Sequence, residues 1–251
     1  MLSLVVIAQD AEESIGACLD SVPFAAERVV LDSGSSDRTR AVAEAHGARV
    51  VACDWPGHIA QKNRAMTEAR FDWILSLDAD ERLSPEAADE LELALQNPCM
   101  DVAFSFPRLS EWCGTPLRHG RWYPDRKVRV VRRGRGVWVG DDPHDRLQTD
   151  GSVRALKSNI LHFPYANLDE YFETVERYSR IQARSMAARG VRAHFWDVSV
   201  RPPLHFVDAY FRRGGFRDGR VGFAVASIGA SYVLWKWMRL WLEPDPRDEH
   251  R

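Results

Sequence analysis

Three carboxylates follow one apolar run of the chain. Residues 74–77 are Ile-Leu-Ser-Leu, and Asp78, Asp80 and Glu81 come after them. Like charges at the end of one strand repel each other unless a cation or solvent lies between them. Two aspartates separated by one small residue can both offer oxygens to Mg²⁺ or Mn²⁺, which typically takes one or two protein carboxylates together with substrate phosphates. The pattern predicts a metal site at Asp78 and Asp80.

A plainer explanation is that the two aspartates only cap the helix expected from Ser84-Pro85. Ser84 can begin that helix without them, because Ser before Pro at the first helical position is a good helix start. A further aspartate, Asp32, ends the apolar run Val29-Val30-Leu31. Acidic residues at the ends of two such runs favour a ligand site over a cap.

Short β-branched runs alternate with helical patterns through the first hundred residues. Strands are expected at 4–7, 29–31, 50–51 and 73–77. Helices are expected after a capping box of Asp10 and Glu13, over 38–46 with a stop at Gly47, and over 60–69. This alternation implies a parallel, doubly wound sheet, in which ligands bind beyond the carboxyl ends of the strands.

The net charge of −2 conceals an uneven distribution. The first hundred residues carry 8 basic and 18 acidic side chains, and the remaining 151 carry 26 and 18. This suggests a metal site in the first part and an anionic partner for the second. The 4 cysteines lack zinc-ligand spacing, so we expect free thiols in a reducing compartment. We expect neither a signal peptide nor a membrane span, since the uncharged run 221–235 is shorter than roughly 20 residues.

The chain resembles the inverting glycosyltransferases of family 2, which have the GT-A nucleotide-sugar fold. The stretches that carry this resemblance are 4–7, 30–37, 61–65 and 73–81. The chain is similar in particular to the subgroup typified by the lipopolysaccharide inner-core β-glucosyltransferases. That similarity is carried by Trp55 and Gly57 ahead of 61–63, by 119–125 and by 215–219.

The resemblance implies an α/β fold, in which a GT-A domain with a mostly parallel central sheet precedes a helical C-terminal extension. The domain would cover residues 1–165, as a nucleotide-sugar half (1–100) and an acceptor half (101–165). The extension would cover residues 166–251.

The resemblance also implies a UDP-sugar site and a Mn²⁺ or Mg²⁺ ion. The nucleotide-sugar site would comprise Ala8, Gln9, Asp32, Lys62 and Asp78. Asp32 would bind the uracil or ribose, Asp78 would face the ribose and the metal-bound diphosphate, and Asp80 would ligate the ion directly. Many members have two aspartates after the second strand, whereas Ser33 takes the second position here. Asp32 would therefore make its contact alone.

An inverting transfer needs one base, which takes the proton of the acceptor hydroxyl as it attacks the anomeric carbon. Residues 140–147 are the richest in carboxylates after residue 100, and the related subgroup commonly has its acid at the position of Asp145. We therefore predict Asp145 as the base, with Asp125, Asp141 and Asp142 as alternatives. The plain alternative makes Asp141-Asp142-Pro143 a surface turn.

The acceptor site is predicted at Trp122, Tyr123, Asp125 and His144. Aromatic faces stack on sugar rings but also form ordinary cores. Pro124 and Asp125 place the aromatic pair in a turn, which favours substrate contact. His162 is a candidate for an additional metal ligand, because GT-A enzymes sometimes recruit a distant histidine, and a hydrogen-bonded structural role is its alternative.

The basic second part has two features that suit anionic partners. Residues 126–133 alternate basic and apolar side chains, which predicts a half-buried strand with a positive face for a phosphorylated glycolipid or a membrane. A solvated strand paired with neighbouring acids is the alternative. Helices are expected from Leu168, over 204–211 and over 223–241, and the last, rich in Trp, suits either the membrane interface or packing on the catalytic domain.

These features lead to one hypothesis. The chain would be a cytoplasmic enzyme, peripheral on the inner face of the cytoplasmic membrane, that transfers a hexose, with glucose the first choice, from a UDP-sugar to a lipid-linked saccharide such as lipopolysaccharide core. A polyprenyl phosphate or a capsule precursor is an alternative acceptor. A non-catalytic nucleotide-sugar-binding scaffold is the alternative from another class. A pI near 6.5 and the lack of a nucleic-acid motif argue against nucleic acid as a partner.

Overall fold

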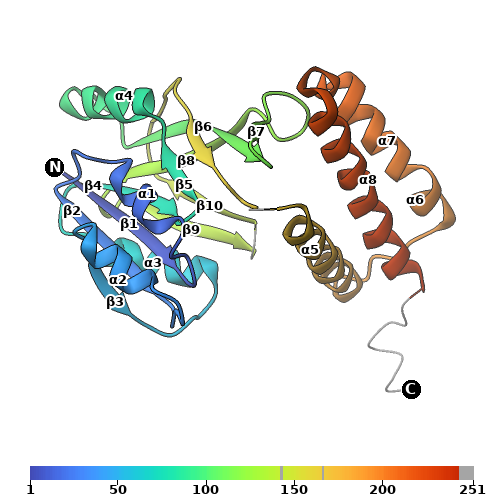
Figure 1. Ribbon diagram of the computed structural model, residues 1–251, viewed down its shortest axis with the longest axis horizontal. Coiled ribbons are helices and arrows are strands. Elements are labelled where there is room, and N and C mark those ends of the chain that lie inside the picture. Colours follow the sequence, from blue (N-terminus) through green and yellow to red (C-terminus); the bar gives the residue numbers. More distant parts are fainter. Residues whose placement is uncertain (142–143, 166, 243–251) are drawn as a thin grey trace. The chain divides into compact units, whose positions relative to one another are not determined.

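The computed structural model describes residues 1–141, 144–165 and 167–242, except for the side chains of 141 and 144. The chain divides into two compact units. The first, which we call the sheet unit, comprises residues 1–109 and 125–163 (Figure 1). The second, the helical unit, comprises residues 110–124 and the described residues from 164 to 242. Residues 110–124, which we placed in the acceptor half of the first domain, thus group with the C-terminal helices.

Parallel strands form the centre of the sheet unit, in the order β3-β2-β1-β4. These strands are β1 (Leu2–Ala8), β2 (Glu27–Asp32), β3 (Arg49–Ala52) and β4 (Trp73–Asp78). The register pairs Ala8 with Asp32 and Ile7 with Asp78. The carboxyl ends of β1, β2 and β4 therefore lie at one edge, and the predicted parallel sheet is confirmed.

Later strands extend this sheet, mostly in the antiparallel sense. β8 (Asp125–Arg132) pairs with β4, and β6 (Ala103–Trp112) pairs with β8. The shorter strands are β5 (Glu81–Leu83), β7 (Thr115–Pro116), β11 (Val153–Ala155) and β12 (Ile160–His162). Of these, β11 runs parallel to β6. β9 (Gly136–Asp141) and β10 (His144–Thr149) form a separate antiparallel pair, which carries Asp145.

Helices cover both faces of the parallel strands. They are α1 (Ile15–Asp20), α2 (Thr39–Ala45), α3 (His58–Thr67) and α4 (Pro85–Gln96). Successive residues of a strand point to opposite faces, so Leu4 and Val6 join a core with α1 and α4. Val5 and Ile7 join a second core with α3. Gly47, with a φ of 78°, follows α2 as the predicted helix stop.

One predicted helix start is wrong. α1 begins after Ser14, without a capping box of Asp10 and Glu13. Instead, Asp10 Oδ1 accepts the backbone N–H of Ser36 at 2.8 Å and the hydroxyl of Ser36 at 3.0 Å. The Asp10 carboxylate, which we expected to cap α1, therefore orders the loop that follows β2.

The helical unit is built around two long helices, α5 and α8. Its elements are α5 (Leu168–Ala188), α6 (Phe195–Ser199), α7 (Arg201–Val207), a π-helical turn η1 (Asp208–Arg212), a 3₁₀ turn η2 (Gly215–Asp218) and α8 (Gly219–Leu242). Trp112 and Leu117 pack in one core with Tyr171 of α5 and Val225 of α8. The three helices that we expected are present, and α6 is an addition to them.

The stretch from Gly215 to Leu242 is long and apolar enough to span a membrane by length and composition. This differs from our expectation, because the helix continues beyond the uncharged run 221–235 to Leu242 with only Lys236 and Arg239 charged. Within the helical unit, α8 buries Val225, Ile228 and Trp237. Length and composition therefore do not distinguish a span from a packed helix.

Candidate active site

A buried lysine joins the end of the central sheet to the β9–β10 pair. Lys62, on α3, is 4% exposed. Its Nζ lies 2.7 Å from Asp78 Oδ1, at the end of β4, and 2.7 Å from Asp145 Oδ2, on β10. Burial opposes its charge, but the attraction of Asp78 and Asp145 outweighs burial and raises the pKa of the ammonium. Lys62 is therefore cationic and brings together two predicted site residues.

Two arginines continue this line of contacts. Arg129 Nη2, on β8, lies 3.0 Å from Asp78 Oδ2 and 2.6 Å from Glu81 Oε1. Arg108 Nη1 lies 3.2 Å from Glu81 Oε1, and its Nη2 lies 2.6 Å from Asp125 Oδ2. Acids and bases thus alternate in what we call the charge chain, which consists of Asp145, Lys62, Asp78, Arg129, Glu81, Arg108 and Asp125.

The basic members of the charge chain keep its buried acids ionised. Burial raises the pKa of a carboxyl group, because the charged form loses its hydration. Glu81 is fully buried, yet Arg129 outweighs burial and lowers the pKa of Glu81. Lys62 and Arg129 likewise hold the pKa of Asp78 well below its usual range against the effect of burial. Both carboxylate oxygens of Asp78 are therefore engaged by protein cations.

Asp80 has a different environment, which suits a metal ion better. Its side chain is 40% exposed, and its Oδ2 lies 3.4 Å from Nε2 of His162. The pairing of β5 with β12 brings His162 to this position. A carboxylate oxygen and an imidazole nitrogen can both ligate Mn²⁺, and substrate phosphates would complete its coordination. Within the described residues, no cluster of three or more His, Cys, Asp or Glu side chains could hold a metal without such help.

Asp32 lies at the end of β2, fully buried. Its Oδ2 accepts the backbone N–H groups of Gly34 and Ser35, each at 3.1 Å, and Arg40 Nε lies 3.6 Å away. The carboxylate thus shapes its own loop, while its contact with a nucleotide stays a prediction. Of the neighbouring predicted residues, Ala8 accepts the N–H of Ser33 at 3.0 Å and Gln9 is exposed after β1.

The predicted acceptor residues fall into three different settings. Asp125 belongs to the charge chain. Trp122 and Tyr123 belong to the helical unit, where Trp122 makes edge contacts with the rings of Tyr165 and Tyr171 at 6.5 and 6.1 Å. Trp122 therefore contributes to an apolar cluster. The side chain of His144 lies outside the described residues, as do Asp142 and the side chain of Asp141.

The predicted positive face of residues 126–133 is wrong. Arg126 Nη1 donates to the carbonyl oxygens of Ser105 and Leu156 at 3.0 and 2.9 Å. Arg129 is buried in the charge chain, and Arg132 lies 4.8 Å from the ring of Trp73. The alternative, a solvated strand paired with neighbouring acids, holds in part, because Arg129 and Lys127 pair with acids whereas Arg126 and Arg132 donate to backbone carbonyl oxygens.

Sequence reasoning missed the roles of Glu81, Arg129 and Arg108. Arg129 precedes the buried Val130 and Val131 in β8, at the point where the pairing with β6 shifts register. A basic residue within a buried stretch of strand requires an acid nearby. Its position beside the apolar pair is the signal that could have identified Arg129.

A family model described as "Glycosyl transferase family 2" matches residues 3–154. The chain belongs to glycosyltransferase family 2. This membership confirms the predicted enzyme class and, with the observed elements, the α/β GT-A domain followed by C-terminal helices. The roles of the individual site residues remain predictions.

Similar proteins cover most of the chain. It is 30% identical over 240 residues to the lipopolysaccharide core biosynthesis glycosyltransferase LpsC of Rhizobium meliloti, covering 93% of this chain and 89% of LpsC. An uncharacterized glycosyltransferase of Rickettsia bellii is 28% identical over 242 residues, covering 91% and 82%. A solved structure of glucosyl-3-phosphoglycerate synthase from Mycobacterium tuberculosis, with Mn²⁺, UDP and glucosyl-3-phosphoglycerate, is 26% identical. That match has a TM-score of 0.37 and spans 44% of this chain and 43% of the synthase.

Replacing Arg129 by Met should destabilise the protein by about 3 to 5 kcal/mol, because Glu81 then stays buried without its main partner. The control Arg135→Met, which breaks the exposed pair with Asp150, should cost less than about 1 kcal/mol. Urea unfolding measures both values. Equal losses in the two variants would contradict a structural role for the buried pair.

The same comparison has a defined pH dependence. The folded-state pKa of Glu81 is depressed, so the contribution of the Arg129 pair is present above the unfolded pKa of about 4.3. It is lost as the pH falls toward the folded-state pKa. The difference in the free energy of unfolding between the wild type and Arg129→Met should therefore become smaller as the pH is lowered, and urea unfolding at a series of pH values measures it.

Proposed function

We propose that the chain is an inverting glycosyltransferase that transfers a hexose from a UDP-sugar to a lipid-linked saccharide such as lipopolysaccharide core. The observation that carries this proposal is the Lys62 bridge, which holds Asp78 of the expected donor site and the candidate base Asp145 each 2.7 Å from one ammonium. LpsC, by its name an enzyme of lipopolysaccharide core biosynthesis, matches nearly the whole chain and supports this acceptor class.

Asp145 acts as the base in this proposal. Its side chain is 15% exposed, and Lys62 contacts its Oδ2. Asp145 takes the proton of the acceptor hydroxyl, whose oxygen bonds to the anomeric carbon from the face opposite the diphosphate. The bond between that carbon and the diphosphate oxygen breaks, and UDP leaves with the electron pair.

Asp80 and His162 would hold the divalent ion in this proposal. Such an ion, when bound, neutralises the negative charge that develops on the departing diphosphate. Asp78 would lie next to the ion and contact the ribose. Its carboxylate is oriented by Lys62 and Arg129. We assign Asp80 rather than Asp78 as the ligand, because Lys62 and Arg129 already neutralise Asp78.

We further propose that the helical unit attaches the enzyme to the inner face of the cytoplasmic membrane. Val200, Leu204, Val207 and Phe211 follow each other at helical intervals and are 38%, 59%, 48% and 58% exposed, and we call them the apolar stripe. Exposed apolar surface of this kind marks a protein or membrane contact. Exposed basic side chains favour anionic lipid: Arg201 of α7, Arg212 of η1 and Arg213, which follows η1.

Asp145→Asn should lower kcat for transfer by about 10²- to 10⁴-fold, the usual contribution of a general base. Release of UDP in the presence of acceptor measures this rate. The control Asp150→Asn changes an exposed acid just after β10 and should behave as the wild type. If Asp145→Asn and Asp150→Asn were equally active, Asp145 would not be the base.

Asp80→Asn should weaken the binding of Mn²⁺ in the presence of UDP by at least about tenfold, because it removes an anionic ligand. Electron paramagnetic resonance of free Mn²⁺ measures this affinity directly, without turnover. His162→Ala should weaken it as well, whereas Asp89→Asn, at an exposed position of α4, should not. Unchanged affinity in Asp80→Asn would remove Asp80 from the metal site.

The double variant Leu204→Ser, Phe211→Ser should bind anionic vesicles at least about tenfold more weakly, since burying each side chain in lipid contributes about 1.5 to 3 kcal/mol. Raised salt should also release the wild type. Cosedimentation with phosphatidylglycerol vesicles measures binding. The control Leu93→Ser alters a leucine of α4 that is 65% exposed. A double variant that bound as well as this control would exclude the apolar stripe as the contact.

A further inference from the structure

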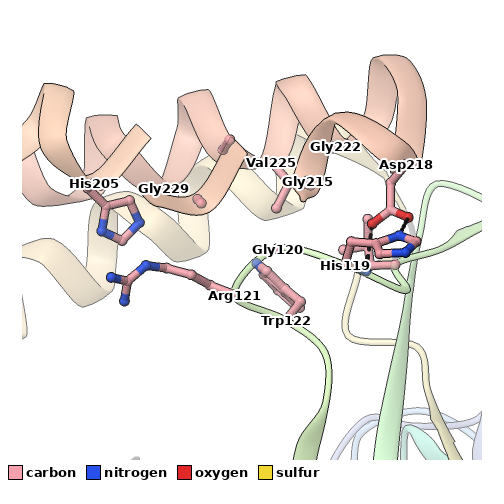
Figure 2. A pocket seen from close by; sticks show the side chains of 13 residues that line it. His119, Gly120, Arg121, Trp122, His205, Gly215, Asp218, Gly222, Val225 and Gly229 are labelled. Carbon is pink, nitrogen blue, oxygen red and sulfur yellow. Dashed lines mark hydrogen bonds and ion pairs between the residues drawn. The ribbon is translucent and has the colours of Figure 1, made fainter. Parts of the chain in front are cut away.

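The helical unit contains an open cavity of ≈ 430 Å³ with an unusual lining. Three basic side chains, Arg121, Arg201 and Lys236, surround it together with His205, Asp208 and Trp237. Figure 2 shows Arg121 and His205, which also line a smaller adjoining pocket, approaching each other from the segment after β7 and from α7. A cavity of this volume is large enough for a monosaccharide with a charged substituent.

Basic groups outnumber acidic groups around this cavity. Asp208 is shared by three guanidinium groups, since Arg121 lies 2.6 Å and Arg213 3.0 Å from its Oδ2 and Arg212 contacts its other oxygen. Arg201 pairs with Asp197 at 2.5 Å. Lys236 lies over the rings of Tyr232 and Trp237, at 5.2 and 5.8 Å. The acids near the cavity therefore do not balance its bases.

The titration of two lining residues agrees with this excess. Burial and then the proximity of Arg201 lower the pKa of Lys236. Burial and then Arg121 lower the pKa of His205, although Asp208 acts in the opposite direction. An anion in the cavity would relieve the mutual repulsion of these cations.

The ion pairs also have a structural use, because Arg121 links the segment 119–122 to Asp208 of η1. That use does not require Arg201 and Lys236, which sit on α7 and α8 with the ring of Trp237 beneath them. The guanidinium of Arg201 lies 4.7 Å from this ring, and its Nε lies 2.5 Å from Asp197 Oδ1. A guanidinium with an ammonium next to it is a pair of groups that binds phosphate oxygens.

We propose that this cavity binds a phosphate group carried by the lipid-linked saccharide acceptor, an inference that rests on the proposed function. Leu204 connects the cavity to the membrane contact, because it lines the cavity and also belongs to the apolar stripe. The lipid tail of an acceptor would stay in the bilayer at the stripe, while its phosphorylated head enters the cavity. Arg201 and Lys236 contact the phosphate, and Trp237 forms the floor.

The test measures the binding of inorganic phosphate and of a hexose phosphate to the full chain by titration calorimetry, at constant ionic strength. Lys236→Gln should raise the Kd for both at least about tenfold, because a charge-assisted hydrogen bond is lost. Lys236→Arg should restore binding, since it keeps the charge. The control Arg184→Gln removes an equal charge from an exposed position of α5 and should leave both Kd values unchanged.

A second arm identifies the source of the phosphate. Phosphatidylcholine vesicles with a phosphorylated glycolipid should bind the wild type more tightly than vesicles with the dephosphorylated glycolipid, and Lys236→Gln should remove that difference. Preference for inorganic phosphate over both the hexose phosphate and the glycolipid would overturn the assignment to the acceptor. Equal Kd values for Lys236→Gln and Arg184→Gln would overturn the site itself.

These results are separable from the proposed function. Phosphate binding is measured without donor sugar or turnover, so it does not depend on the base or on the metal. Asp145→Asn should lose transfer and still bind the hexose phosphate as the wild type does. Loss of transfer in that variant together with unchanged binding in Lys236→Gln would leave the proposed function intact and refute the phosphate site.

Discussion

The arrangement of the sheet unit depends on one buried ammonium. Lys62 comes from α3, Asp78 from β4 and Asp145 from the β9–β10 pair, and no two of these elements are hydrogen-bonded neighbours in a sheet. Arg129 also contacts Asp78, so the two cations share the two carboxylates. The β9–β10 pair is held at the end of β4 by this contact, by the hydrogen bonds between Asn63 of α3 and the backbone of Trp138, and by the packing of Trp138 in the core. The distance between donor and base in the proposed reaction follows from that constraint.

The same network explains how three neighbouring acids acquire different properties. Asp78 and Glu81 are ionised because arginine and lysine surround them, whereas Asp80 turns outward toward His162. Lys62, Arg129 and Arg108 thus neutralise the carboxylates of Asp78 and Glu81, a role that the sequence alone would assign to a metal ion. The ion would then be needed mainly when the diphosphate, with its own negative charge, is present.

Local sequence patterns predicted the parallel strands, the stop at Gly47 and the helix start at Ser84, because each depends on residues close in the chain. The capping box of Asp10 failed because its carboxylate bonds Ser36, 26 residues away. The basic strand failed for the same reason, since the partners of Arg129 lie 48 and 51 residues before it. Asp145 was placed by resemblance, and its contact with Lys62 could not be foreseen from either segment.

The grouping of residues 110–124 with the C-terminal helices makes the helical unit discontinuous in the chain. Trp112 and Leu117, which are 6% and 1% exposed, take their apolar partners from α5 and α8. During synthesis these two side chains leave the ribosome long before α8 exists. They can be fully buried only after α8 has been synthesised. A chain cut after the sheet unit would keep these side chains exposed. Segment 110–124 is therefore the part of the chain that is prone to aggregate until α8 has been synthesised.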